Sequence, residues 1–515
     1  MNAVLRGLLA LSVLILATAC GGDSGDGAPP DASLGHDATP DATPPDATPE
    51  VCLCDQNLAL SDYCVAQCAT SFETLFAHSQ LPSFYLTIPD DNGAPGQSSW
   101  ELLASCTREE HQQVDRPAHC DYQIGSFHAE YDPFPDDGNL EVVTTPEIPV
   151  GIRRKGRATW RDLDDKPSLK VKFTEFDSER FLGLTRLTLN NMVQDPSMMR
   201  ERVAYHVYRA LDVTAPLANH ARVYVRRNDA EDYQYYGLYA NVQTLDKRFL
   251  EYNFGRVDGE LGNLFDTYND VFFTDLDRAN ARQQAGPAPG AQEARFELET
   301  NDTVPDISDL TAAIDAVYTV DPLADNSQFV EDIEAILDVD AFLRTFAAMA
   351  IITDWDGFAG ARNNYKLYHD LVRDRFVLFP WGTDQTFGWQ DSVYYPNWDY
   401  AFDHTDSRRE PSLASKHCAA DPTDCQARYL ALADDAVTSF GLLDLSGLTQ
   451  EIEAQTEFAA LADTRKPYSD LEYYRGILYL RHYLENRASC ARGQLDGQPC
   501  APLTCPPGSS GNCSP

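Results

Sequence analysis

Basic residues are scarce in this chain of 515 residues, which has 40 Lys and Arg against 80 Asp and Glu and a formal net charge of −40 at pH 7. An acidic field of this size repels phosphate backbones, so we expect no nucleic acid partner. Several enzyme motifs are also lacking: the Gly-x-Ser-x-Gly elbow, the His-Glu-x-x-His pair, and the Gly-x-Gly-x-x-Gly, His-Arg-Asp and Asp-Phe-Gly motifs of standard protein kinases. The sequence therefore gives no support for hydrolases that carry these motifs or for standard protein kinases. Aromatic residues are plentiful at 11%, which predicts a chain that is mostly folded.

An apolar run lies at the N-terminus. Arg6 precedes residues 8–19, and small residues then lead to Cys20. The run is too short to span a bilayer, which takes about 20 residues, and its layout is that of a secretory signal. Because a cysteine follows the small residues, the segment resembles a bacterial lipobox. We expect residues 1–19 to be a signal peptide and Cys20 to be lipidated, which anchors an exported protein at the bacterial outer membrane or cell surface. The alternative is a cleaved signal with an incidental cysteine.

Residues 20–50 repeat the sequence Asp-Ala-Thr-Pro and carry almost no large apolar side chains. Such a segment cannot offset the entropy lost on ordering, so it predicts a disordered tether.

Twelve cysteines remain besides Cys20, an even number that suits an oxidising compartment. We predict disulfides within local groups, with zinc as the alternative for the groups of four. Two cysteine-rich segments, 51–74 and 489–515, flank a body at 75–488. The groups are Cys52, Cys54, Cys64 and Cys68; Cys106 and Cys120; Cys418 and Cys425; and Cys490, Cys500, Cys505 and Cys513.

Cations gather in one part of the acidic body. Residues 150–159 include Arg153, Lys155 and a glycine, and a predicted strand at 166–173 places Lys170 and Lys172 on one side. Cations beside a glycine turn suit an anion, although a solvated strand face explains the same pattern.

A helix predicted at 195–211 begins with Asp195 as its cap. It carries Glu201 off its apolar stripe, where the carboxylate either pairs with a strand lysine or lies at the surface. Two segments after it, 221–225 and 235–242, are predicted to form a β-hairpin.

The most specific chemistry follows an apolar helix predicted at 339–352. Asp354 and Asp356 come after this helix, then Asn363 and Asn364, and Asp384 follows a predicted strand at 376–379. Carboxylate and amide oxygens are the ligands that Mg²⁺ or Mn²⁺ prefers, and kinases use such a set as a base and metal ligands.

At these residues the sequence resembles the CotH kinases, a family of atypical protein kinases. The matching pieces occur in family order over roughly residues 80–488 and are Arg153-Arg154-Lys155-Gly156, Lys166-Pro167-Ser168 through Phe173, Leu189-Asn190-Asn191, Asp195-Pro196-Ser197, Tyr236 through Tyr239, Asp246 through Leu250, Trp355-Asp356, Asn363-Asn364-Tyr365 and Pro380 through Gly388. The resemblance implies an α+β, two-lobed kinase-like fold, with an antiparallel sheet lobe at about 80–250, a helix-rich lobe at about 310–488 and ATP between them.

The resemblance also implies roles for single residues. Asp356 would orient or deprotonate a substrate hydroxyl, and Asn364 (or Asn363) and Asp384 would hold Mg²⁺ or Mn²⁺ on the ATP phosphates. Nucleotide contacts would come from Arg153, Lys155, Lys166, Lys172 and Glu201, the last by fixing a lysine. The implied reaction is phosphate transfer to Ser or Thr of surface or secreted proteins, with the particular substrate open.

Three positions depart from the family pattern. Gly382 stands where the family has an acid, Gln243 stands where it has Glu, and Asp354 lies close to Asp356 and competes for the role of the acid. The alternative function is therefore an inactive, kinase-like surface binding or structural lipoprotein.

Overall fold

The structure is a computed structural model of the full chain. The chain divides into two units, Met1–Val51 and Cys52–Pro515. All described residues belong to the second unit: 72–90, 96–113, 116–133, 142–228, 231–267, 296–301, 303, 305–319, 326–359, 363–388 and 422–498. The predicted signal peptide, Cys20, the tether, the cysteines at 52–68 and those from 500 onward lie outside the described residues.

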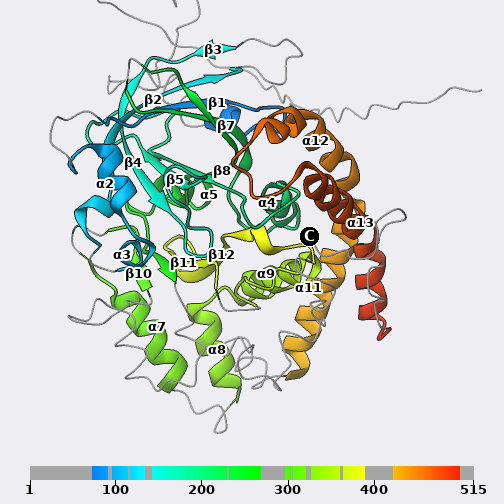
Figure 1. The fold of residues 1–515 in the computed structure, drawn as a ribbon. Helices are drawn as coiled ribbons and strands as arrows, with labels where there is room; N and C mark the ends of the chain where they lie inside the picture. Colours follow the sequence, from blue (N-terminus) through cyan, green and yellow to red (C-terminus); the bar gives the residue numbers. More distant parts are fainter. Residues whose placement is uncertain are drawn as a thin grey trace, which may run out of the picture. The chain divides into compact units, whose positions relative to one another are not determined.

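An eight-stranded sheet occupies the first half of this unit (blue to green in Figure 1). Its order is β1-β7-β8-β6-β5-β4-β2-β3, and β1 also pairs with β2, so seven of the strands close into a barrel. The expected antiparallel pairing holds except between β1 and β7, which are parallel. The strands are β1 Ser83–Thr87, β2 Gln123–Tyr131, β3 Val143–Thr144, β4 Ile148–Lys155, β5 Ser168–Lys172, β6 Arg186–Asn190, β7 Ala218–Arg226 and β8 Gln234–Val242. The predicted hairpin is β7–β8.

Alternation along the strands separates an apolar barrel interior from a polar outer face. Leu169 and Val171 of β5 are fully buried in one apolar cluster with Phe127 of β2. Lys170 and Lys172 therefore project from the opposite face of β5, as the period-2 pattern predicts.

Three short elements lie between β1 and β2 in the sequence: α2 Ser99–Ser105, α3 Arg108–His111 and η1 Ala118–Cys120. Trp100 and Leu103 of α2 pack into the apolar cluster of the barrel. The predicted disulfide between Cys106 and Cys120 is present. Cys425 and Cys490 each take part in a disulfide as well, and Cys418, the predicted partner of Cys425, lies outside the described residues.

A second, four-stranded sheet has the order β10-β9-β11-β12. Its strands are β9 Leu264–Thr267, β10 Phe296–Leu298, β11 Tyr365–Asp370 and β12 Arg375–Pro380. The helical C-terminal region follows it (orange to red in Figure 1). The remaining helices are α4 Arg200–Ala210, α5 Lys247–Asn253, α7 Ser308–Thr319, α8 Asn326–Ile336, α9 Val339–Ile352, α11 Pro422–Leu442, α12 Leu445–Ala462 and α13 Asp470–Leu495. Among the described residues, no helix is both long enough and apolar enough to cross a membrane.

Helix α4 begins later than the sequence predicted. Asp195 does not start the helix but satisfies its first amides from outside, because its Oδ2 accepts hydrogen bonds from the backbone N–H of Met199 and of Arg200, each at 2.7 Å. Asp195 also forms a buried ion pair with the guanidinium of Arg200 at 3.0 Å. The N-terminus of α4 is therefore anchored by one carboxylate.

A buried ion pair joins the barrel to the segment between α12 and α13. Lys166 Nζ lies 2.6 Å from Asp463 Oδ2, and both side chains are almost wholly buried. Asp463 also accepts a hydrogen bond from the backbone N–H of Leu238 in β8. Next to Leu238, Gly237 has a φ of +128° and leaves no room for a Cβ against the Asp463 carboxylate. The barrel and the segment between α12 and α13 thus meet at a closely packed contact, where substitutions of Gly237 or Asp463 are poorly tolerated.

We predict that Asp463→Ala lowers the free energy of unfolding by about 3 to 5 kcal/mol, because the Lys166 ammonium is left buried without its counter-charge. Chemical denaturation measures this change. The matched control is Asp470→Ala, which removes an ion pair with Lys466 whose acid is 61% exposed and should cost less than about 1 kcal/mol. Equal losses in the two variants would contradict the prediction.

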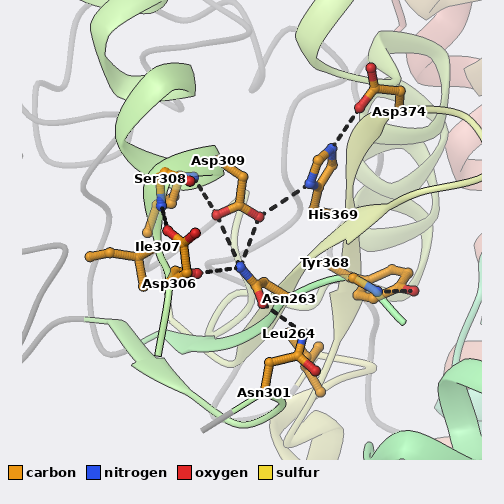
Figure 2. A network of polar contacts seen from close by, with 12 residues as sticks. Asn263, Leu264, Asn301, Asp306, Ile307, Ser308, Asp309, Tyr368, His369 and Asp374 are labelled. Carbon is orange, nitrogen blue, oxygen red and sulfur yellow. Dashed lines mark hydrogen bonds and ion pairs between the residues drawn. The ribbon is translucent and has the colours of Figure 1, made fainter. Parts of the chain in front are cut away.

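A polar network fastens the start of α7 to the second sheet (Figure 2). Asn263 Nδ2 donates to the backbone oxygen of Asp306 and to the Asp309 carboxylate. His369 at the β11–β12 turn lies 3.1 Å from both Asp309 and Asp374. The hydrogen bond with Asp309, and then the charges of both carboxylates, raise the pKa of His369 above its usual value.

Because the pKa of His369 is higher in the folded protein, folding favours its protonated form. The protonated His369 therefore stabilises the fold fully at pH values below the usual histidine pKa near 6.5, and this stabilisation is lost as the pH rises through the raised pKa of the folded state. We predict that His369→Asn destabilises the protein at pH 5.5 by about 1 kcal/mol or less and has its smallest effect at alkaline pH. Unfolding curves across this range, with His482→Asn on the exposed side of α13 as control, measure the difference. A difference in unfolding free energy between the wild type and His369→Asn that grows with pH would contradict a raised pKa for His369.

Candidate functional site

A cavity of about 360 Å³ lies between the outer face of β4, β5 and β6 and the second sheet with its loops. Its volume is that of a small-molecule site. Among the predicted residues it is lined by Arg153, Lys155, Glu201, Asp356, Asn363, Asn364 and Asp384. The structure thus brings together residues that are more than 200 positions apart in the sequence.

One wall of the cavity is cationic. Arg153 of β4 lies directly opposite Lys170 of β5 in the sheet register, and Lys155 lies two residues further along β4, on the same face. Like charges at opposite positions destabilise a sheet, so this wall is costly without an anion to face it. The pKa of Lys170 is lowered to about 8, mainly by burial and also by the neighbouring ammonium groups of Lys366 and Lys155, against the effect of Glu299.

Glu201 enters the cavity from the first turn of α4 and is buried. Asn190 of β6 joins it to Lys155, since the Asn190 amide donates to Glu201 Oε1 at 2.7 Å and its oxygen accepts from Lys155 Nζ. Burial and the nearby Asp384 raise the pKa of Glu201, and Lys155 opposes this. The predicted alternative of a surface Glu201 is wrong.

The end of α9 and the loop after it carry the candidate acid. In α13, Arg487 donates from Nε and Nη2 to the last carbonyls of α9, at Ile351 and Ala350, each at 2.8 Å, and Tyr483 also donates to Ile351 at 2.8 Å. These contacts satisfy carbonyls that a helix terminus leaves open. At the next turn the backbone of Gly388 donates to Thr353 Oγ1 at 2.7 Å. The segments that bear Asp356 and Asp384 are thereby tied to each other.

Asp356 faces the cavity between two amides. Asn364 Nδ2 donates to its Oδ2 at 2.7 Å, and Asn363 Nδ2 donates to its Oδ1 at 3.3 Å. Burial raises the pKa of Asp356, and the two amides limit the rise. Both asparagines therefore orient the acid in this structure. Asp354 is buried behind it and does not line the cavity.

Asp384 and Asn364 offer oxygen ligands that fit a divalent cation. Burial raises the pKa of Asp384 to about 7, and Asp356 and Asp195 act in the same direction, so its negative charge is poorly compensated by the protein. A hard cation beside these oxygens would relieve that imbalance. Gly382 has a φ of +60°, and a Cβ there would lie 3.0 Å from Asn364 Oδ1. The glycine that departs from the family pattern therefore suits the local backbone.

A second group of acids and cations near the cavity includes a lysine that the sequence analysis missed. Lys366 of β11 lies 3.0 Å from Asp266 and 3.4 Å from Glu299. Burial alone would lower the pKa of Lys366, but these two carboxylates outweigh it and raise the pKa. The only feature of the sequence that placed Lys366 near the site was its position two residues after Asn364.

Three residues singled out in the sequence lie elsewhere. Lys166 is held by Asp463, and Lys172 pairs at the surface with Glu175, one step along β5 from Lys170. Neither lysine lines the cavity. The Gln243 side-chain oxygen accepts from the backbone N–H of Leu217 at 3.1 Å, also outside the cavity. Strand alternation identified the correct face of β5, but the lysine next to the site is Lys170.

Another cluster of metal-type ligands among the described residues is Glu110, His119 and Cys120. Cys120 is in a disulfide, so its sulfur is not a thiolate ligand and the cluster is not a metal site of this kind.

A lysine and glutamate joined by an amide, an acid held by asparagines, and a second buried acid form a set that is typical of phosphoryl-transfer sites. The CotH kinase protein family matches residues 152–490, and the chain belongs to that family. It is 25% identical over 250 residues to the inner spore coat protein H of Bacillus subtilis (strain 168), a match that spans 48% of this chain and 61% of that protein.

Among solved structures, the chain is similar to one titled Shewanella oneidensis MR-1 toxin antitoxin system HipA, HipB and its operator DNA complex. The identity is 11%, the match covers 67% of this chain and 69% of that chain, and the TM-score is 0.28. A TM-score this low supports no detailed comparison of the folds.

Proposed function

We propose that this protein is a metal-dependent, kinase-like enzyme that transfers a phosphoryl group from ATP to Ser or Thr hydroxyls of surface or secreted proteins. The observation that carries the proposal is the convergence of Asp356, Asn364, Asp384 and the Lys155–Glu201 pair on one cavity, in a chain of the CotH kinase family. Phosphoryl transfer depends mainly on positioning and charge neutralisation, which these groups supply.

Each group has a distinct part in the proposed reaction. Asp356, fixed by two amide donors, orients the acceptor hydroxyl and takes its proton. The ammonium groups of Lys155 and Lys170 face the phosphates, and Glu201 with Asn190 holds Lys155 in place. Asp384 and Asn364 hold Mg²⁺ or Mn²⁺, which when bound offsets the charge of the phosphates.

The proposed setting is the bacterial outer membrane or cell surface, with a lipid on Cys20 as the membrane anchor. The signal at residues 8–20 supports export. An exported kinase requires ATP in its compartment, so activity is best measured first with purified protein and added nucleotide.

The testing experiment is phosphate incorporation from labelled ATP with Mg²⁺ or Mn²⁺. We predict incorporation by the wild type and a loss of about a hundredfold or more in Asp356→Asn, which removes the proposed base, and in Asp384→Ala, which removes a proposed ligand of the metal on the phosphates. Folding is checked by thermal unfolding. A folded wild type that neither incorporates label nor is stabilised by ATP with metal would instead be a surface binding protein.

A second prediction separates the lysines of β5. We predict that Lys170→Ala weakens ATP binding by about tenfold, whereas Lys172→Ala changes it by less than about twofold, because only Lys170 faces the cavity. Titration calorimetry with ATP and Mg²⁺ measures both. The reverse order would show that the nucleotide lies further along the strand than the cavity does.

A further inference from the structure

A buried tyrosine–aspartate pair lies directly behind the candidate acid. Tyr208 of α4 donates its hydroxyl hydrogen to Asp354 Oδ2 at 2.6 Å. Tyr208 is 0% exposed and Asp354 is 4% exposed. Among the described residues, Asp354 Oδ1 has no hydrogen-bond partner. Among the residues that the structure describes, Tyr208 is thus the one side chain that donates to this carboxylate.

Asp354 is closely packed against the loop that bears Asp356. The backbone N–H of Gly357 donates to the backbone oxygen of Asp354 at 3.3 Å. A Cβ placed on Gly357 would lie 2.9 Å from Asp354 Oδ2. The Asp354 carboxylate therefore packs directly against the residue that follows Asp356, and a shift of one displaces the other.

Stability alone disfavours an aspartate at this position. Asp354 follows the C-terminal end of α9, where the helix dipole repels negative charge. Burial raises its pKa to about 7, and the neighbouring Asp356 and Asp384 act in the same direction, against the hydrogen bond from Tyr208. A residue that costs stability beside a candidate active site indicates a functional requirement.

Tyr208 belongs to a polar stripe of α4 that touches three parts of the site. Glu201, Tyr205 and Tyr208 follow each other at spacings of four and three, so they lie on one helix face. Glu201 is bonded to Asn190 of β6. The Tyr205 oxygen accepts from the backbone N–H of Gly382 at 3.1 Å, in the loop that bears Asp384. Tyr208 extends this stripe to the loop of Asp356.

We propose that Tyr208 and Asp354 are positioning residues for the transfer reaction. Their hydrogen bond couples α4 to the loop of Asp356 and sets the direction of the Asp356 carboxylate toward the cavity. This inference rests on the proposed kinase function and adds to it a specific link between α4 and the candidate base. Neither residue lines the cavity, so loss of either should affect transfer rather than ATP binding.

The test is the steady-state kinetics of Tyr208→Phe, which removes one oxygen and keeps the buried ring. We expect kcat to fall by about tenfold or more, with the KM for ATP within about twofold of the wild type. The control is Tyr473→Phe in α13, a buried tyrosine whose ring packs against Tyr474 and whose hydroxyl has no hydrogen-bond partner among the described residues. It should leave both constants unchanged.

Variants of Asp354 give the second part of the test. Asp354→Asn keeps an oxygen that accepts from Tyr208 and removes the buried charge, so it should retain much more activity than Asp354→Ala. In the Tyr208→Phe background, Asp354→Asn should restore part of the lost kcat, because an amide needs the donor less than a carboxylate does. Additive losses of kcat would overturn the coupling.

A measurement that does not depend on catalytic activity tests this inference separately from the proposed function. Hydrogen exchange of the amides at 353–357 should be faster in Tyr208→Phe than in wild type and unchanged in Tyr473→Phe. If the wild type shows no transfer, the proposed function fails while exchange still decides the coupling. The positioning role would be overturned if Tyr208→Phe left hydrogen exchange or kcat unchanged. It would also be overturned if the fall in kcat were matched by an equal loss of global stability.

Discussion

The site depends on how the C-terminal end of α9 is held. Arg487 and Tyr483 of α13 bind the last carbonyls of that helix, and the following turn is fastened to the loop of Asp384 through Thr353 and Gly388. With the helix end satisfied, the chain can turn sharply and present Asp356 to the cavity. Helix α13 thus fixes loops that lie far before it in the sequence, with 136 residues between Arg487 and the carbonyl of Ile351.

Burial disfavours the charged forms of groups on both sides of the cavity, although Glu201 partly offsets this for Lys155 and Glu299 does so for Lys170. Lys155 and Lys170 lie on the barrel side, where burial lowers their pKa. Asp384 lies on the opposite side, where burial raises its pKa. Each group would be more stable in its charged form with a partner of opposite sign. A nucleotide with its metal provides both signs at once, which explains why such a cavity is retained despite its cost.

Much of this arrangement was predictable from local patterns, and the remainder was not for identifiable reasons. Alternation placed Lys170 and Lys172 on one face of β5, but it carries no information about which of them lies beside the cavity. Lys166 was misplaced because its partner, Asp463, is 297 residues away. The contribution of α4 was only partly visible in the sequence: Glu201 was singled out, whereas Tyr208 was not, because its partner, Asp354, lies 146 residues further along the chain.

We propose that this cavity holds a nucleotide through a metal bound by Asp384 and Asn364. A crystal structure with a non-hydrolysable ATP analogue and Mn²⁺, in which anomalous scattering locates the metal, tests this proposal. We expect Mn²⁺ at about 2.2 Å from oxygens of both residues, with the phosphates against Lys155 and Lys170. If Mn²⁺ is bound elsewhere, or the nucleotide lies outside the cavity, the proposed site is wrong.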